Sequence, residues 1–413
     1  MHQLSTDGEF AFILEEMLSL SNNFGANTGE VLRAASRITA GDFESFHDEF
    51  KLLADGIHDQ AVSINGTRFP VSAREAYFRS ASYYRAADFF LHGNTSDPRI
   101  YSLWEAALDD FDRALELLPT LAQRVRVSAN NFTVPVIFYE PPVRSTESDK
   151  GDSSGKQKIP TVVVGNGFDS SQEELYHFLG RSILDRGWNF VSYEGPGQPT
   201  VRRQQNLGFM ANWWEVVTPV VNYLSQRPDV DVDRVALVGV SFGGTLAPLA
   251  ASREHRLSAV LAIDGVTSLF ASIEKQFPPE MMQLYRSGRR AAFDETLLSV
   301  MENGTYPSQL RWAIGQSLFA FDTRSPYEAF SRLGEIVADA EVLRKVTCPT
   351  FVAAGDNDSM APGQAEEMAK LLSDRGTYHQ FKARLGAGEH CQLGAEAQLA
   401  QVGLDWLAEV WDR

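Results

Sequence analysis

Two stretches near the N-terminus, 73–91 and 104–118, place apolar residues three or four positions apart with polar residues between them. This spacing predicts two amphipathic helices, and Ser72 and Glu75 have the separation of a capping box at the start of the first one. Two tandem helices could open a repeat array, but no third copy with matching residues follows. We therefore predict an N-terminal helical domain over residues 1–122.

Beyond this region the pattern changes to short runs of apolar and β-branched residues that alternate with helical stretches. The runs of strand length lie at 132–139, 161–164, 188–193, 235–238, 259–263, 349–354 and 378–381. Helical patterns lie between or after them at 210–224, directly after Phe242, at 365–372 and at 395–410. This alternation predicts an α/β fold with a mostly parallel, doubly wound sheet covered on both faces. The polar, Gly- and Ser-rich segment 144–158 predicts a surface loop.

The alternation stops between residues 268 and 345, where the pattern is largely helical. We interpret this stretch as a helical lid inserted into the α/β core, so that the core comprises residues 123–267 and 346–413. The insertion is rich in aromatic residues and methionine, which predicts an apolar pocket wall between lid and core and a medium-sized, mostly apolar substrate. Packing of the lid helices against one another is the plainer alternative.

Charge and cysteine content narrow the classes of function. The formal net charge is −17, from 37 Lys and Arg against 54 Asp and Glu, which argues against binding to nucleic acid or to an anionic membrane surface. No signal-peptide pattern and no long apolar run is present, so we expect a cytoplasmic protein. Cys348 and Cys391 are the only cysteines, which excludes a disulfide framework and a zinc site built from cysteines. We expect neither a metal nor a cofactor.

The segment Gly239–Gly243 reads G-V-S-F-G and lies between a buried strand and an Ala- and Leu-rich helix, the context of a nucleophile elbow. Gly239 and Gly243, two positions before and after Ser241, have no Cβ and allow the neighbouring backbone to approach closely on a strained turn. The N–H of Phe242 and the helix N-terminus then face whatever Ser241 attacks. We predict that Ser241 is a nucleophile; a Gly-rich turn with an idle serine is the alternative.

A serine nucleophile requires a base, and His390 is the strongest candidate among eight histidines because it lies on a Gly-rich loop between the last strand and the last helix. A carboxylate must orient this imidazole. Asp358 follows the strand at 349–354 and gives the chain order Ser, Asp, His that α/β-hydrolases use. Asp264, which follows the strand at 259–263, is the alternative acid.

Two further turns follow predicted strands. Gly165–Ser170 comes after the strand at 161–164, where a second oxyanion donor is expected, and the backbone N–H of Phe168 is the candidate. A plain strand-to-helix turn is the alternative. Glu194–Gln198 reads E-G-P-G-Q and lacks the motif of a phosphate-binding loop, so we interpret it as a turn under the rim of the active site.

The sequence resembles a group within the α/β-hydrolase superfamily. The segments that carry the resemblance are the G-V-S-F-G elbow, the turns at Gly165–Ser170 and Glu194–Gln198, the loops with Asp358 and His390, and the helix that begins at residue 74. This group includes the fermentation-respiration-switch-like proteins, dihydroxypseudooxynicotine hydrolase, and fungal hydrolases of polyketide and melanin pathways. The resemblance implies a catalytic triad of Ser241, Asp358 and His390 and backbone oxyanion donors at Phe168 and Phe242. It also implies that the N-terminal helices contribute to the substrate cavity and that the protein forms a homodimer.

The resemblance further suggests an auxiliary acidic role for Asp169, which matches a functional acidic position in some members. We therefore expect a serine hydrolase of secondary metabolism that cleaves a carbon–carbon bond between carbonyls, or an ester, in a polyketide-like small molecule. Two alternatives stay open: non-hydrolytic cyclisation or dehydration by the same triad, and a ligand-binding protein on a hydrolase fold.

Overall fold

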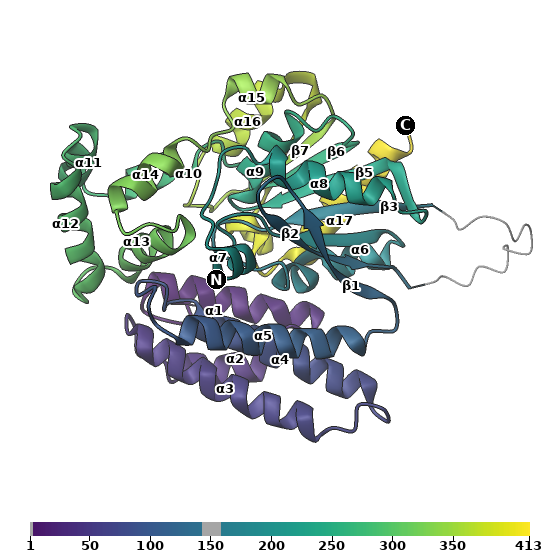
Figure 1. Cartoon of the computed structure of the whole chain (residues 1–413), viewed down its shortest axis with the longest axis horizontal. Helices are drawn as coiled ribbons and strands as arrows, with labels where there is room; N and C mark the ends of the chain where they lie inside the picture. The colour runs from purple at the N-terminus through teal and green to yellow at the C-terminus, as the bar shows by residue number, and fades with distance from the viewer. Residues whose placement is uncertain (1–2, 143–157) are drawn as a thin grey trace, which may run out of the picture. The chain divides into compact units, whose positions relative to one another are not determined.

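The computed structural model describes residues 3–142 and 158–413, and the chain divides into two compact units (Figure 1). The first unit consists of Met1–Leu118, Arg202–Phe209 and Phe270–Gly334, and the second of Pro119–Val201, Met210–Leu269 and Glu335–Arg413. The chain therefore passes between the units several times, and the domain boundaries drawn from the sequence stay a prediction. Apart from Lys158, the loop predicted at 144–158 lies outside the described residues.

The first unit contains helices and no strand among its described residues. Its helices are α1 (Gly8–Ser19), α2 (Thr28–Ala35), α3 (Phe43–Ser63), α4 (Pro70–Asp88), α5 (Arg99–Glu116), α11 (Pro279–Arg286), α12 (Arg290–Glu302), α13 (Ser308–Ala320) and α14 (Pro326–Gly334), with α7 (Pro199–Gln205) and α10 (Leu269–Gln276) where the chain enters it. The side chains of Asp7, Asn27 and Asp42 accept backbone N–H bonds at the starts of α1, α2 and α3. Such caps satisfy donors that have no partner inside the helix.

The capping box predicted at Ser72 and Glu75 is wrong. α4 begins earlier, at Pro70, and the residue before it, Phe69, makes no side-chain capping bond. Proline suits the first helical position because its φ is already helical and the N–H it lacks would have no partner there. Pro70 therefore starts the helix, and Ser72 lies within its first turn.

Aromatic side chains form much of the core of the first unit. The rings of Phe10, Phe46 and Phe90 contact one another with centroid separations of 4.8 to 5.0 Å. They come from α1, from α3 and from the segment after α4, and all three side chains are buried. Packing between residues far apart in the sequence thus fixes these helices together.

A buried cluster of charged residues also joins distant segments of the first unit. Asp88, fully buried at the end of α4, accepts hydrogen bonds from Arg85 at 3.3 Å and Arg203 at 2.5 Å, and it lies 3.1 Å from Nε2 of His92. Nδ1 of His92 lies 2.6 Å from the side-chain oxygen of Gln316 on α13. Burial raises the pKa of Asp88, but the combined effect of Arg203, His92 and Arg85 lowers it by more. The net shift of the pKa is therefore downward, and the carboxylate stays charged.

The second unit contains an eight-stranded sheet in the order β1-β2-β4-β3-β5-β6-β7-β8. The strands are β1 (Ala122–Ser128), β2 (Thr133–Tyr139), β3 (Ile159–Gly165), β4 (Asn189–Tyr193), β5 (Val230–Val240), β6 (Ala259–Ile263), β7 (Thr350–Gly355) and β8 (Gly376–Phe381). β1 and β2 pair antiparallel with their neighbours, and all pairs from β4 to β8 are parallel. The predicted α/β class with a mostly parallel sheet is confirmed.

Helices cover this sheet in two layers (Figure 1). One layer contains α8 (Trp214–Ser225), α9 (Gly243–Ala251), α15 (Ala340–Arg344) and α16 (Gln364–Leu372), and the other contains α6 (Arg181–Asp185) and α17 (Glu396–Trp411). The strands between them, β2, β3, β4, β6 and β7, contain no Lys, Arg, Asp or Glu. Burial on both faces accounts for these continuous apolar runs.

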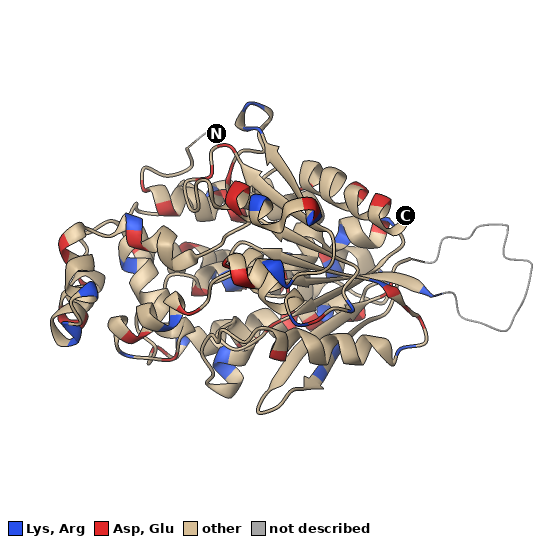
Figure 2. Ribbon diagram, turned by 90° about the horizontal axis from the view of Figure 1, so that it is seen from above, with Lys and Arg blue, Asp and Glu red and all other residues tan. Residues whose placement is uncertain are grey.

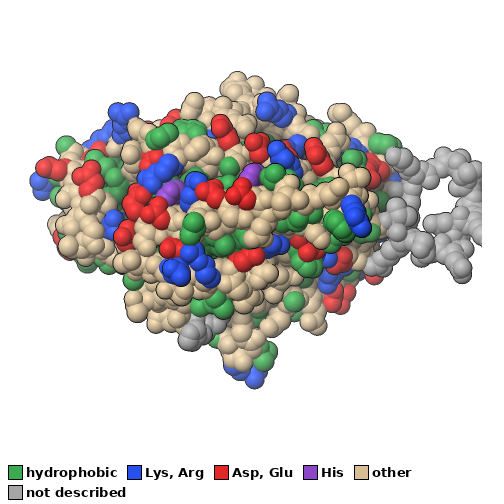
Figure 3. Space-filling view, turned by 90° about the horizontal axis from the view of Figure 1, so that it is seen from below, with side chains coloured by type: hydrophobic (Ala, Val, Ile, Leu, Met, Phe, Trp, Pro, Cys, Tyr) green, Lys and Arg blue, Asp and Glu red, His purple; other side chains and the backbone are tan. Residues whose placement is uncertain are grey.

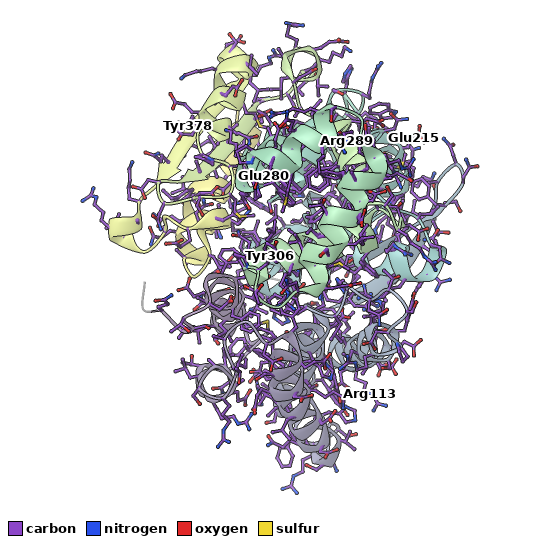
Figure 4. The ribbon with its side chains drawn as sticks, turned by 90° about the vertical axis from the view of Figure 1, so that its left-hand side faces the viewer. Arg113, Glu215, Glu280, Arg289, Tyr306 and Tyr378 are labelled. Carbon is purple, nitrogen blue, oxygen red and sulfur yellow. The ribbon has the colours of Figure 1, made fainter. Side chains whose placement is uncertain are left out.

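Charged residues lie mainly on the helices and loops (Figure 2). Figure 3 shows acidic and basic side chains interspersed on the face of the molecule that it presents. Figure 4 labels Glu280 and Arg289 on the segment of α11 and α12, Tyr306 before α13, and Tyr378 on the edge strand β8. None of the described helices is long and apolar enough to cross a membrane.

Candidate active site

Ser241 lies in the turn between β5 and α9 and has a φ of 59°. A residue other than glycine rarely adopts this left-handed conformation, so the turn stores strain. The adjoining glycines have no space for a side chain: a Cβ at Gly239 would lie 1.9 Å from the backbone oxygen of Gly243, and a Cβ at Gly244 would lie 2.1 Å from that of Asp264. The G-x-S-x-G turn therefore depends on close backbone contacts that only glycine permits.

The structure brings Ser241, His390 and Asp358 together. Nε2 of His390 lies 2.9 Å from Oγ of Ser241, and Nδ1 of the same ring lies 3.1 Å from Oδ2 of Asp358. His390 begins a short helical turn between β8 and α17, and Asp358 lies on the loop after β7. The carboxyl ends of adjacent parallel strands thus place three residues that are distant in the sequence around one imidazole ring.

A second carboxylate, Asp264, also approaches His390. Its Oδ2 lies 3.2 Å from Nδ1 of His390, at ion-pair distance, and its two oxygens accept bonds from the Cys391 backbone N–H at 2.5 Å and the Gln392 amide at 2.9 Å. Asp358 accepts a hydrogen bond from the same ring nitrogen at 3.1 Å. The acid predicted from the sequence and its alternative therefore lie side by side on the same nitrogen.

These carboxylates determine the charge preference of His390. Burial lowers the pKa of the imidazole, but interactions with Cys391, Asp264 and Asp358 outweigh it and raise the pKa well above its usual value. Since burial raises the pKa of the Cys391 thiol and keeps it neutral, we attribute the upward shift of His390 to the two carboxylates. For Asp358, burial raises the pKa and His390 lowers it, and the net shift is downward.

The turn after β3 packs directly against the serine. A Cβ at Gly167 would lie 2.9 Å from Cβ of Ser241 and 3.1 Å from the backbone nitrogen of Phe242. Phe168, the next residue, is buried, and its ring meets that of Phe242 edge to face with centroids 6.1 Å apart. Phe168 and Phe242 therefore flank Ser241, and Asp169 follows as a half-buried side chain.

Comparisons with known proteins identify the family of the chain. Residues 218–301 match the family model described as BAAT / Acyl-CoA thioester hydrolase C terminal. Hydrolase acrC of Aspergillus aculeatus is 30% identical over 98% of this chain and 96% of its own length, and 20-hydroxy-prefusarin hydrolase FUS2 of Gibberella moniliformis is 28% identical over 98% and 97%. The chain is therefore an α/β-hydrolase of the family that includes these fungal hydrolases. The resemblance found in the sequence is thereby confirmed.

The fold of this α/β-hydrolase also matches that of a solved structure. The crystal structure of 2,6-dihydroxy-pseudo-oxynicotine hydrolase superposes with a TM-score of 0.72 over 95% of each chain, at 19% sequence identity. The likeness covers the helical N-terminal region as well as the sheet, because nearly the whole chain takes part in it. At this identity it establishes the fold alone.

The E-G-P-G-Q segment of the α/β-hydrolase does more than form a turn. Glu194, fully buried, accepts bonds from the backbone N–H groups of Gln172 at 3.0 Å and Thr200 at 2.7 Å. Burial and then the nearby Glu173 raise its pKa to about 7. Gln198, also fully buried, bonds to the turn after β3. The sequence offered one signal for these contacts, an acid and an amide in a Gly- and Pro-rich turn after a buried strand.

One group of metal-ligating residue types occurs among the described residues. Asp264, His390 and Cys391 have ligand atoms within 4.8 Å of one another. Their atoms already take part in hydrogen bonds: both oxygens of Asp264 accept, Nδ1 of His390 faces Asp358, and Sγ of Cys391 lies 3.6 Å from the Ile263 carbonyl. This arrangement favours a hydrogen-bonded support for His390 over a metal site. Both cysteines are free in the structure.

Proposed function

We propose that this α/β-hydrolase acts through a triad in which Ser241 is the nucleophile, His390 the general base and Asp358 the group that orients the base. The observation that carries the proposal is the pair of distances on one imidazole, 2.9 Å to Ser241 and 3.1 Å to Asp358. Both lie within the hydrogen-bonding range that proton transfer requires. Asp358 accepts a hydrogen bond from Nδ1–H of His390. The proton therefore stays on Nδ1, and the Nε2 lone pair is available to take the proton of Ser241.

The proposed oxyanion hole consists of the backbone N–H groups of Phe168 and Phe242. Gly167 packs on Ser241, so the peptide that follows it lies beside the nucleophile, and Phe242 precedes the N-terminus of α9. Backbone donors fixed in this way stabilise the charge that develops on a carbonyl oxygen under attack. Asp169 lies next to Phe168, and an auxiliary acidic role for it remains part of the proposal.

We propose that the substrate is a polyketide-like small molecule of secondary metabolism with a carbon–carbon bond between two carbonyls, or an ester. The support is sequence similarity to relatives, one of which is named a 20-hydroxy-prefusarin hydrolase. Ser241 adds to one carbonyl, the carbon–carbon bond breaks, and its electron pair forms an enolate that takes a proton from His390. Water then hydrolyses the acyl-enzyme to release a carboxylic acid.

Labelling of the nucleophile tests the triad. A serine-directed phosphonate should add one mass increment to the wild-type protein and none to Ser241→Ala, and this variant should lose about 10⁴- to 10⁶-fold in rate while circular dichroism stays unchanged. Labelling at another residue, or turnover retained by the variant, would remove Ser241 from the mechanism.

Isotope incorporation tests the reaction. With a 1,3-dicarbonyl substrate in ¹⁸O-labelled water, one labelled oxygen should appear in the carboxylic acid product. A product with the mass of the substrate minus water, formed without label and without an acyl-enzyme, would replace hydrolysis by cyclisation or dehydration on the same residues.

A further inference from the structure

The side chain of Gln198 is fully buried. Both the nitrogen and the oxygen of its amide form hydrogen bonds to backbone groups, two of them in the turn that packs against Ser241. Its Nε2 donates to the carbonyl of Asn166 at 2.8 Å and to that of Gly167 at 3.1 Å, while its Oε1 accepts from the N–H of Gly195 at 2.8 Å. A primary amide has two N–H donors, and here two consecutive backbone carbonyls receive them. The amide therefore joins the turn after β4 to the turn after β3.

We propose that Gln198 is a positioning residue that fixes the orientation of the Gly167–Phe168 peptide, whose N–H is the oxyanion donor in the proposed function. The inference rests on that function. A trans peptide is planar and its N–H points opposite to its carbonyl, so a bond that fixes the Gly167 carbonyl also fixes the direction of the Phe168 N–H. The bond from Gln198 holds this N–H on the side of the peptide away from Gln198.

The same bond also affects the strength of the donor. A hydrogen bond accepted by a peptide carbonyl polarises the peptide and makes its N–H a better donor. Gln198 and Gly167 are both buried, and a hydrogen bond is stronger in such a low-dielectric environment than in water. The second bond, to the Asn166 carbonyl, fixes the preceding peptide in the same way, so the turn keeps one orientation on both sides of Gly167.

Glutamine suits this position because both donors are required at once. Glutamate has the same shape but, when ionised, would place acceptor oxygens against two carbonyl oxygens. Methionine fills a similar volume and donates to neither carbonyl. These two replacements remove the bonds to the turn by different means and therefore provide two independent tests.

The neighbouring Glu194 provides a matched control. It lies in the same turn, is equally buried, and holds Gln172 and Thr200 through their backbone N–H groups without bonding to the Gly167 carbonyl. Glu194→Gln should therefore alter the stability of the segment without changing the oxyanion donor.

The experiment compares p-nitrophenyl esters with their thionoester analogues, in which sulfur replaces the carbonyl oxygen. Sulfur is a weak hydrogen-bond acceptor, so the ester-to-thionoester rate ratio reports the contribution of the oxyanion donors. For Gln198→Met, kcat for the ester should fall about 10- to 100-fold with KM within about twofold, and the thionoester rate should change little, so that the ratio falls about tenfold or more. Glu194→Gln should keep the wild-type ratio.

Circular dichroism checks the fold of each variant, and Gln198→Glu takes the place of Gln198→Met if the latter does not fold. Equal loss of rate on ester and thionoester would show that Gln198 only stabilises the structure and would overturn the inference. Absence of phosphonate labelling at Ser241 in the wild-type protein would instead contradict the proposed function. The two failures are therefore distinct.

Discussion

Nδ1 of His390 has two carboxylate neighbours at nearly the same distance, Asp358 at 3.1 Å and Asp264 at 3.2 Å. We predict that Asp358→Asn lowers kcat/KM by about 10³- to 10⁴-fold, because an amide in its place favours the wrong imidazole tautomer. Asp264→Asn should lower it far less, since that carboxylate mainly holds the backbone of Cys391 and the side chain of Gln392.

Asp356 serves as the control for this comparison. It lies on the same loop as Asp358 and bonds to the backbone N–H of Ala383, away from His390, so Asp356→Asn should stay near the wild-type rate. Steady-state kinetics on the three variants provides the measurement. The reverse ranking of Asp358 and Asp264 would transfer the role of orienting the base to Asp264.

The raised pKa of His390 predicts the pH dependence of the reaction. A general base must be neutral, and the neutral fraction grows as the pH rises through the pKa of the imidazole. The carboxylates outweigh burial, so the pKa of His390 lies well above its usual value. The acid limb of the kcat/KM profile should therefore lie at higher pH than it would for a histidine with an ordinary pKa. Asp264→Asn should move this limb to lower pH. A limb that does not move would mean that Asp264 does not raise the pKa of His390.

The residues with a local signature could be predicted from the sequence. Ser241 lies in a G-x-S-x-G pentad between a buried strand and a helix, and His390 lies on a Gly-rich loop between the last strand and the last helix. The local context along the chain therefore pointed to both residues. Gln198 could not be assigned its contacts, because its carbonyl partners Asn166 and Gly167 lie more than thirty residues away on another turn. The approach of Asp264 and Asp358 to the same nitrogen likewise arises from the pairing of β6 with β7.

Among the elements, the buried strands were the most predictable. The run at 259–263 coincides with β6, which is buried along its whole length. β1, Ala122–Ser128, was missed because it is an edge strand with Arg124 and Arg126 among its residues and much of it is exposed, so that no clear apolar run marks it. Burial on both faces produces a strong sequence pattern, and an edge produces a weak one.

The elbow between β5 and α9 yields a prediction about a whole element. Gly239→Ala would place a Cβ 1.9 Å from the backbone oxygen of Gly243, so β5 and α9 could not keep their present approach. We expect the variant to lose catalytic activity and to melt at a markedly lower temperature, because the contact is with backbone that cannot rotate away.

Gly56→Ala is the matched substitution. Gly56 lies within α3 and is exposed, and a Cβ at this position would have no atom within 4 Å. Alanine there should stabilise the protein by about 0.5 to 1 kcal/mol, because alanine has the higher helix propensity. Thermal melts of the two variants provide the measurement. An unchanged melting temperature for Gly239→Ala would mean that the elbow can rearrange.

For the molecule as a whole, the chain order conceals how the first compact unit is assembled. Three separate stretches form it, and their contacts are specific: a Cβ at Gly315 would lie 2.7 Å from Cα of Gly93. Sequence periodicity predicted the helices 73–91 and 104–118 but not the contact between Phe89, at the end of the first one, and Trp312 on α13. Such contacts depend on tertiary structure that no local pattern encodes.

The charged cluster around Asp88 provides a test of that assembly. Asp88 is the buried counter-ion of Arg85 and Arg203, so Asp88→Asn would leave two guanidinium groups buried without its charge. We expect a loss of about 3 to 5 kcal/mol in the free energy of unfolding, as for other buried ion pairs that lose one partner. Glu328→Gln, which breaks the exposed pair with Arg290, should cost less than about 1 kcal/mol. Denaturant titrations followed by circular dichroism measure both values. Equally small losses would mean that hydrophobic packing alone holds the three stretches together, whereas the predicted difference would assign a substantial part of that stability to Asp88.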